Sequence, residues 1–504
     1  MPSKIRTRYA PSPTGIPHIG NIRSALFAWL YARHNNGDFI VRIEDTDQAR
    51  YDADAERAII DSLNWLGLNQ DEGPDVGGQY GPYHQSKRLD LYSEAAIQLV
   101  KDGRAYYCYC SSERLGEVRK AQQARKEPPG YDNHCRDMDF GANGDFTQFE
   151  GSTKNGVIRF KMPLEGVTTA HDIIRGEIAW ENQLLDDFVM VKSDGFPTYH
   201  LASVVDDHAM EISHVLRGDE WLASLPRHWQ IYNALEYEKP IFVHLPIILG
   251  TDKSKLSKRH GAASVFEYKD QGFLAEAMIN FLALLGWSLD DRTELISLPE
   301  LIESFTIERI GSSPAIFNVD KLEWFNGMYI RNLSNGDFIE KLSSFWQTDQ
   351  TPNSFSSSHL EAIAPLVQER TKKLNEVWNQ ISFLEGDIEY PPIRLWSGMG
   401  DKKAQRAERD GTHIEIPENA PEVRNWLSVS LNTLEQLNEW EDEAMEESLQ
   451  IVISNLGTKP RQLFGALRVA ITGGVVSPPL FPSMKILGRE KSLQRISQAI
   501  ALLD

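Results

Sequence analysis

The sequence predicts an α/β protein with a doubly wound parallel sheet, followed by a region made of helices. Residues 1 to about 107 alternate short apolar strand patterns with helical patterns, an order that favours parallel strands joined by helices. The same alternation returns from about residue 188. Beyond about residue 335 helical periodicity dominates, for example over 360–385 and 422–456.

The first strand and helix enclose a turn suited to a polyphosphate. A strand is predicted over 5–9, a Pro- and Gly-rich turn follows, and an amphipathic helix begins near His18 and ends at Asn36-Gly37. The helix start offers unpaired N–H groups and the positive end of the helix dipole to an anion. His18 and Asn21 share one face of the first turn, and Gly20 leaves room for a flat base.

Later elements extend this pattern. A strand over 39–43 ends in an acidic segment that contains Glu44, and helices over 53–66 and 86–101 each end at a glycine. A polar helix over 112–126 and a short strand over 157–162 indicate an insertion. Strand and helix patterns then resume over 188–192, 199–205, 211–216, 221–236 and 241–249. In such sheets ligands bind beyond the carboxyl ends of the strands, where the first turn and Glu44 both fall.

Composition limits the class of protein. The net charge is −20, from 52 basic and 72 acidic residues, but nucleic-acid affinity depends on local clusters of Lys and Arg. No apolar run reaches the ~18 residues needed to span a bilayer. The charged first residues lack an apolar leader, and three cysteines are too few for a disulfide framework. We therefore expect a cytoplasmic protein, and we also expect a monomer.

Two segments carry a resemblance to a known family. The run from Arg8 to Asn21 (RYAPSPTGIPHIGN) resembles the first signature of class I aminoacyl-tRNA synthetases, in the form seen in glutamyl-tRNA synthetases. The segment from Lys255 to Arg259 (KLSKR) follows the 241–249 strand and resembles the second signature of that class, a mobile lysine loop. The resemblance covers the whole chain, most strongly over 5–47, 186–261 and 460–490.

The resemblance implies five regions. The first half of a class I Rossmann-type catalytic domain covers 1–107, and an inserted domain that binds the tRNA acceptor end covers 108–190. The second half of the catalytic domain covers 191–272. A stem covers 273–334, and an all-α anticodon-binding region covers 335–504.

The implied reaction joins L-glutamate to the 3′ end of tRNA(Glu) through a glutamyl-adenylate, and it releases pyrophosphate and AMP. ATP enters with Mg²⁺. Such chemistry depends on positioning and on charge neutralisation. The catalytic roles fall on His18, Lys255 and Lys258. The ATP-binding residues are His18, Gly20, Asn21, Glu220, Lys255, Ser257 and Lys258.

Glutamate has a side-chain carboxylate, which arginine can hold with two parallel hydrogen bonds. By resemblance, the arginines hold this carboxylate, and Glu44 receives the α-amino group. The glutamate-binding residues are then Arg8, Ala10, Ser12, Glu44, Tyr199 and Arg217. For Arg42, Asp45 and Asp47 a structural ion-pair network is an equal interpretation, so these three are left out of the predicted site.

The three cysteines have the spacing of a zinc site found in some members of the family. Cys108 and Cys110 are two apart, and 24 residues separate Cys110 from Cys135. Zinc favours four ligands, and the position two after Cys135 holds Asp137, which can ligate zinc. A zinc site with these four residues and a set of three reduced thiols remain the two interpretations.

The helical region carries basic and aromatic groups suited to splayed bases, and the predicted tRNA-binding residues are Arg370, Lys373, Arg461 and Arg468. Three alternatives compete with a glutamate–tRNA ligase. Glutaminyl-tRNA synthetases share the signatures but have a β-barrel anticodon region. A truncated paralogue that modifies a tRNA base would lack the helical region. A tRNA-binding protein without catalysis would not need both signatures.

Overall fold

The computed structural model describes residues 4–138, 152–256, 264–349, 355, 357–391, 396 and 420–503, with only the backbone described at 152–155, 348–349 and 357. The chain divides into two compact units. The first contains residues 1–269 and 275–322, and the second contains 270–274 and 323–504. In the described ranges, none of the helices combines the length and apolar character needed to cross a bilayer.

A six-stranded sheet forms the centre of the first unit. Its strand order is β2 (Asp38–Val41), β1 (Arg6–Tyr9), β8 (His214–Gly218), β9 (Ile241–Leu245), β5 (Val167–Asp172) and β6 (Gly176–Glu181). The first five strands are parallel, and β6 runs antiparallel to β5. The chain leaves β1 for β2 on one side, while β8 pairs on the other. The switch point, where ligands bind in open α/β sheets, therefore lies between β1 and β8.

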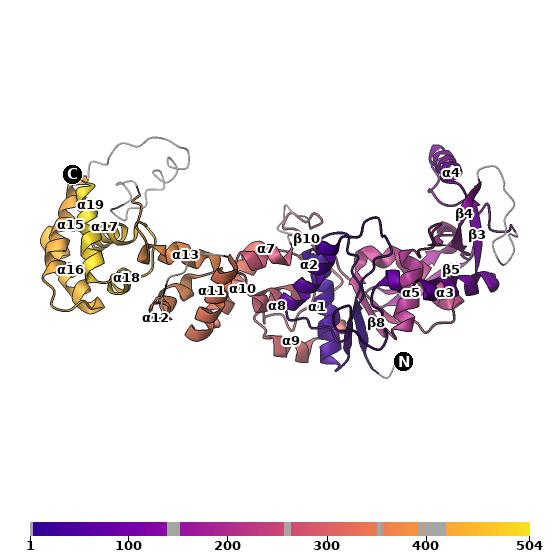
Figure 1. The fold of residues 1–504 in the computed structure, drawn as a ribbon, viewed down its shortest axis with the longest axis horizontal. Coiled ribbons are helices and arrows are strands. Elements are labelled where there is room, and N and C mark those ends of the chain that lie inside the picture. Colours follow the sequence, from indigo (N-terminus) through magenta and orange to yellow (C-terminus); the bar gives the residue numbers. More distant parts are fainter. Residues whose placement is uncertain are drawn as a thin grey trace. The chain divides into compact units, whose positions relative to one another are not determined.

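Helices that accompany the strands of this unit include the following, all but α6 labelled in Figure 1: α1 (Ile19–His34), α2 (Ala53–Trp65), α3 (Leu89–Lys101), α5 (Tyr199–Ala209), α6 (Leu225–Ala234), α8 (Ala275–Ala283) and α9 (Leu298–Ser304). The expectation that α1 is amphipathic was wrong, because ten of its sixteen residues are buried. It packs against β1 and β8 and also against α8 and α9. Helices α8 and α9 cover the face of α1 that we expected to be exposed to solvent.

A second, antiparallel sheet contains β3 (Ala105–Cys110), β4 (Ser152–Phe160) and β7 (Val189–Val191), and α4 (Ser112–Ala124) follows β3. Figure 1 shows β3 and β4 side by side, with α4 near their end. The hairpin of β5 and β6 lies within the predicted insertion, yet it extends the main sheet through the pairing of Asp172 with Phe242. Short strands β10 (Ile248–Leu249) and β11 (Ala315–Ile316) pair in parallel, and α7 (Val265–Asp270) begins just after the lysine segment.

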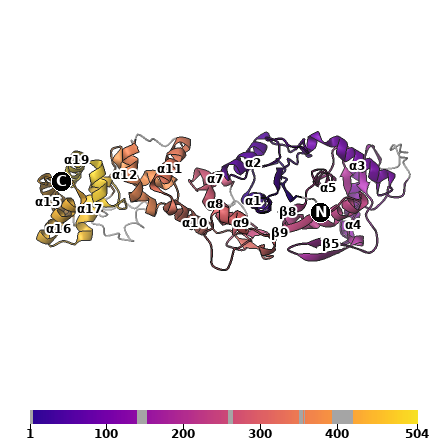
Figure 2. The same cartoon turned by 90° about the horizontal axis from the view of Figure 1, so that it is seen from below.

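In its described residues the second unit is helical, as predicted. Its elements are α10 (Val319–Asn332), which begins in the first unit, and α11 (Asn335–Asp349), α12 (Ser357–Val367), α13 (Asn375–Ile381), α15 (Ala420–Glu435), α16 (Asp442–Leu456), α17 (Pro460–Thr472), α18 (Leu480–Leu487) and α19 (Arg489–Ala501). Helices α15, α16, α17 and α19 pack together (Figure 2). The helical periodicity predicted over 422–456 belongs to two helices, α15 and α16. The extended backbone of Glu441 separates them, and no Gly or Pro in the sequence marks this break.

Two glycines in the first unit give a matched test of turn geometry. In Gly37→Ala the new Cβ would overlap the backbone oxygen of Ile5, which cannot rotate away. Gly67 has a φ of +67° and open space around it. In Gly67→Ala the only cost is therefore the strain of an alanine in the left-handed backbone conformation. We expect a loss of about 1 kcal/mol for Gly67→Ala and at least about twice that for Gly37→Ala, measured by urea unfolding. Equal losses would contradict this account.

Burial of histidine makes the stability of the first unit depend on pH. His214 in β8 is 5% exposed, and burial lowers its pKa to about 4 although Glu308 opposes this shift. The unfolded chain therefore binds a proton near pH 6.5 that the folded chain does not bind until about pH 4. The contribution of the buried, neutral His214 to the free energy of unfolding is complete above pH 6.5, and it declines as the pH falls toward 4.

Between pH 7 and pH 5 we expect His214 to reduce the free energy of unfolding by on the order of 2 kcal/mol. Urea unfolding of the wild type and His214→Asn at both pH values isolates this effect, because other titrating groups cancel in the comparison. The variant should lose that part of the pH dependence. Identical pH dependence in the two proteins would show that His214 is not buried in its neutral form.

Candidate active site

The predicted phosphate turn lies between β1 and α1. His18 is the N-cap of α1, and its Nδ1 accepts a hydrogen bond of 3.0 Å from the backbone N–H of Gly20. A Cβ at position 20 would lie 2.9 Å from His18 Cε1, so glycine is needed there to seat the imidazole. The approach of a base to Gly20 stays a prediction.

The electrostatics of His18 favour its neutral form. Burial lowers its pKa, the nearby Lys255 lowers it further, and Glu220 opposes the shift. Because Nδ1 accepts from Gly20, the neutral ring carries its proton on Nε2. His18 can therefore donate one hydrogen bond from Nε2, at the positive end of the α1 helix dipole.

A cavity of about 760 Å³ opens at the carboxyl ends of β1 and β8. It brings together most of the residues predicted for the active site, from four separate segments of the chain. The predicted residues that line it are Arg8, Ala10, Ser12, His18, Asn21, Glu44, Tyr199, Arg217 and Glu220. Gly20 and Lys255 do not line it, although Lys255 is close enough to affect the pKa of His18.

Arg217, at the end of β8, is held by uncharged groups. Its Nη1 donates to Tyr199 Oη at 2.9 Å, and its Nε donates to His244 Nε2 at 2.9 Å. Burial lowers the pKa of His228, which lies 3.4 Å from Nη1, and also that of His244, so both rings are neutral at pH 7. Within the described part of the chain, no carboxylate forms an ion pair with Arg217, so its charge is available to an anionic ligand.

Arg8 and Glu44 belong to a buried ion-pair network instead. Arg8 Nε lies 3.2 Å from Asp207, and Arg42 contacts both Asp207 at 2.8 Å and Glu44 at 3.0 Å. Burial raises the pKa of Glu44, although Arg42 and Arg8 oppose the shift. The structural interpretation of Arg42 is confirmed. For a buried arginine, such pairing fixes the side chain and offsets the cost of its desolvation.

Asp45 and Asp47 also have structural partners. Asp45 accepts the backbone N–H of Ser86 at 2.8 Å, and Asp47 pairs with Arg50 at 2.6 Å. Asp47 and Arg50 nevertheless line the cavity, together with Lys192, whose Nζ donates to the carbonyl of Thr46 at 3.2 Å. The prediction from sequence did not include Lys192 or Arg50, because no local pattern distinguishes them from surface cations.

The lysine segment returns to the first turn. Lys255 forms an isolated bridge with Leu249, and Ser264 forms one with His18. Ser264 is therefore close to the start of α1, and the effect of Lys255 on the pKa of His18 places Lys255 near it too. Ser257 and Lys258 lie outside the described residues, so their approach to a shared triphosphate with His18 stays a prediction.

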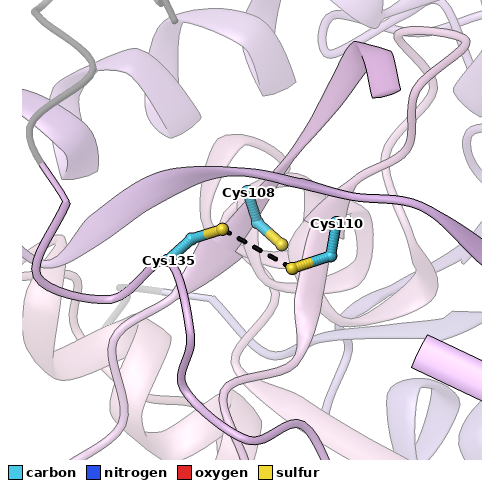
Figure 3. A group of neighbouring side chains, drawn as sticks. All are labelled: Cys108, Cys110 and Cys135. Carbon is cyan, nitrogen blue, oxygen red and sulfur yellow. Dashed lines mark hydrogen bonds between the residues drawn. The ribbon is translucent and has the colours of Figure 1, made fainter. Parts of the chain in front are cut away.

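The three cysteines converge in the second sheet (Figure 3). All three are buried, and their sulfur atoms lie within 4.8 Å of one another. Tyr131 Oη lies 3.3 Å from Cys108 Sγ and 3.6 Å from Cys110 Sγ, and it accepts the backbone N–H of Cys135 at 2.9 Å. The set is compact enough for one metal ion of the kind that prefers thiolates.

Asp137 is not part of this cluster, which corrects the predicted ligand set. Its side chain is 86% exposed and forms an ion pair with Lys161 at 3.3 Å. The turn that follows Cys135, closed by the hydrogen bond from Met138 N–H to the carbonyl of Cys135, directs Asp137 outward. Tyr131 was not among the residues predicted from sequence, because a tyrosine four residues before a cysteine has no recognised ligand spacing.

The predicted tRNA-binding residues have different surroundings in the second unit. Arg370 donates to the carbonyl of Ser477 at 3.3 Å, and the pKa of Arg468 is lowered by burial and by the charge of Arg370. These two arginines are therefore neighbours. Lys373 forms an ion pair with Glu323 at 2.8 Å, and Arg461 is exposed at the start of α17.

Comparison with known proteins is consistent with this geometry. A family model described as the catalytic domain of class I tRNA synthetases (E and Q) matches residues 4–324. A second, described as an anticodon binding domain, matches residues 337–500. A glutamate–tRNA ligase of Dehalococcoides mccartyi (strain ATCC BAA-2266 / KCTC 15142 / 195) is 53% identical and covers 100% of this chain and 99% of its own. That of Acidothermus cellulolyticus is 43% identical, covering 99% and 96%.

Solved structures agree with the sequence relatives. The crystal structure of a glutamate tRNA ligase from Elizabethkingia meningosepticum, in complex with its amino acid, superposes with a TM-score of 0.83. It is 32% identical, and the match covers 100% of both chains. The predicted fold class is thereby confirmed. Together with the cavity at the switch point and the helical second unit, these matches show that the chain belongs to the glutamate–tRNA ligase family of class I tRNA synthetases.

Proposed function

We propose that this chain activates L-glutamate with ATP and transfers it to the 3′ end of tRNA(Glu). In the first step a carboxylate oxygen of glutamate attacks the α-phosphorus of ATP, and pyrophosphate leaves. In the second step a ribose hydroxyl of the tRNA attacks the carbonyl carbon of the adenylate, and AMP leaves. The observation that carries the proposal is the uncompensated guanidinium of Arg217 in the same cavity as the His18 turn.

The cavity has a side suited to glutamate. Arg217 and Arg8 hold the side-chain carboxylate, and Glu44 accepts hydrogen bonds from the α-ammonium group. Ala10 and Ser12 contribute small side chains that leave space for the substrate. Tyr199 donates or accepts through its hydroxyl, which Arg217 already positions at 2.9 Å.

The other side of the cavity suits ATP, which arrives with Mg²⁺. His18 donates from Nε2 to a phosphate oxygen, the side-chain amide of Asn21 adds a further donor, and the positive end of the α1 dipole attracts the phosphates. Glu220 faces the ribose. Lys255 and Lys258 are proposed to neutralise the charge that develops on the leaving pyrophosphate. Ser257 adds a hydroxyl donor beside them, and Gly20 leaves room for the base.

The helical unit is proposed to bind the anticodon, with Arg370, Lys373, Arg461 and Arg468 as phosphate or base contacts. The five regions proposed from sequence, a cytoplasmic location and a monomeric state remain parts of this proposal. A glutamine-specific synthetase is disfavoured, because the described part of the second unit is helical and the matched relatives are glutamate–tRNA ligases.

Substitution of Arg217 tests the assignment of the amino-acid pocket. In Arg217→Ala we expect the KM for glutamate to rise about 100-fold, because a buried charged hydrogen-bond partner of the substrate is lost. The KM for ATP should change less than about threefold. ATP–pyrophosphate exchange in the presence of tRNA measures both KM values. The same assay with glutamine in place of glutamate tests which amino acid is activated.

Arg33→Ala is the matched control, because Arg33 lies at the far end of α1 and pairs with Asp71 at 2.7 Å. This variant should behave like the wild type. An unchanged glutamate KM in Arg217→Ala, or activation of glutamine in preference to glutamate by the wild type, would overturn the proposal.

We also propose a structural zinc ion at Cys108, Cys110 and Cys135, with Tyr131 Oη as the fourth ligand. The fit rests on three buried sulfur atoms within 4.8 Å of one another and on the phenol oxygen directed at them. Such an ion would tie β3 to the segment after α4 and would take no part in the chemistry.

Metal analysis of the purified chain should give about one zinc per molecule. Cys135→Ser should lose the metal and Tyr131→Phe should bind it more weakly. Asp137→Asn should keep it, because its carboxylate points away from the thiols. Zinc loss in the Asp137 variant with retention in the Tyr131 variant would restore the ligand set predicted from sequence, and an absence of zinc in the wild type would leave three reduced thiols.

A further inference from the structure

Three buried side chains on adjacent parallel strands form a hydrogen-bonded row that ends at Arg217. Asp172 at the end of β5 lies 2.7 Å from His244 Nδ1, and His244 in β9 lies 2.9 Å from Arg217 Nε through its other ring nitrogen. Asp172 and His244 are fully buried, and Arg217 is 6% exposed. Neither Asp172 nor His244 lines the cavity.

The donors and acceptors of this row allow only one proton arrangement. Arginine Nε can only donate, so His244 Nε2 accepts, and the neutral ring carries its proton on Nδ1. That proton points at Asp172. Burial opposes ionisation of Asp172, but hydrogen bonds from the His244 ring and from backbone N–H groups hold the pKa of this carboxyl below its usual value. Asp172 is therefore a carboxylate that only accepts.

Three backbone N–H groups donate hydrogen bonds to the carboxylate of Asp172 and fix its orientation. Its Oδ1 accepts the N–H groups of Ile174 and Arg175, both at 2.9 Å, and its Oδ2 accepts the N–H of His244 at 2.9 Å. These bonds join the turn between β5 and β6 to β9. The hairpin that was predicted as part of the insertion thus supplies the anchor of the row.

We propose that Asp172 and His244 are positioning residues that orient Arg217 toward the glutamate side chain while leaving its charge uncompensated. This inference rests on the role proposed above for Arg217. A carboxylate in direct contact with the guanidinium of Arg217 would compete with the substrate carboxylate. The neutral imidazole between Asp172 and Arg217 fixes the geometry of the guanidinium and keeps the negative charge one residue away.

Two amide substitutions of His244 separate positioning from general stability. In His244→Gln the side-chain oxygen reaches the place of Nε2 and can still accept from Arg217. In His244→Asn the shorter amide reaches Asp172 but leaves Arg217 Nε without an acceptor. We expect the glutamate KM to stay within about threefold of wild type for Gln and to rise about tenfold for Asn, with the ATP KM unchanged in both.

The exposed His208, which stacks on Tyr237 outside the cavity, provides the control His208→Gln, expected to match the wild type. Equal glutamate KM values in the two His244 variants, or parallel increases in the KM for glutamate and ATP, would overturn the inference. If Arg217→Ala raises the glutamate KM while His244→Asn does not, the positioning role of Asp172 and His244 is refuted and the proposed function stands. If Arg217→Ala has no effect, the proposed function itself fails.

The proton position gives an independent test that needs no loss of activity. Nitrogen-15 NMR of histidine-labelled protein, with the His244 signal assigned from His244→Gln, should show the neutral ring protonated on Nδ1. In Asp172→Asn we expect a shift of the proton toward Nε2, or a weakened turn at 172–175, and in either case a glutamate KM raised about fivefold to twentyfold. A wild-type ring protonated on Nε2 would contradict the proposed row.

Discussion

The parallel pairing of β1 with β8 is the contact on which the proposed site depends. It sets Thr7 opposite His214, so that Arg8 near the end of β1 and Arg217 near the end of β8 approach the same crevice. The turn that leads to His18 leaves from one strand, and the segment that carries Glu220 leaves from the other. Without this pairing, β1 with the turn that leads to His18 and β8 with Arg217 would no longer lie side by side in the sheet.

Charge compensation divides the buried arginines into two kinds. Arg8 and Arg42 are paired with carboxylates, which offsets the cost of burying them and makes the floor of the cavity rigid. Arg217 is held by tyrosine and histidine side chains, so its orientation is fixed and its charge is not neutralised. In a chain with a net charge of −20, an uncompensated cation inside one cavity concentrates attraction for anionic substrates where the reaction occurs.

The segment between residues 108 and 190 serves two structures at once. Its strands β4 and β7 join β3 in the sheet that carries the cysteine cluster, whereas β5 and β6 complete the main sheet and bring Asp172 beside His244. A change in this segment can therefore act on the proposed amino-acid pocket without touching it. The inserted segment therefore contributes to two separate features, the cysteine cluster and the row of side chains that ends at Arg217.

Local sequence determined the features that act over a few residues. Gly67 and Gly103 have φ values of +67°, and they end α2 and α3 as predicted because only glycine takes that conformation without strain. His18 caps α1, and the residues predicted from the family signatures, among them Arg217 and Glu44, meet in one cavity. Only the tertiary structure decided the burial of α1 on both faces, the strand partner of β5 and the row from Asp172 to Arg217. These depend on contacts between residues far apart in the chain, and neither periodicity nor turn chemistry encodes which distant strand or side chain will be the partner.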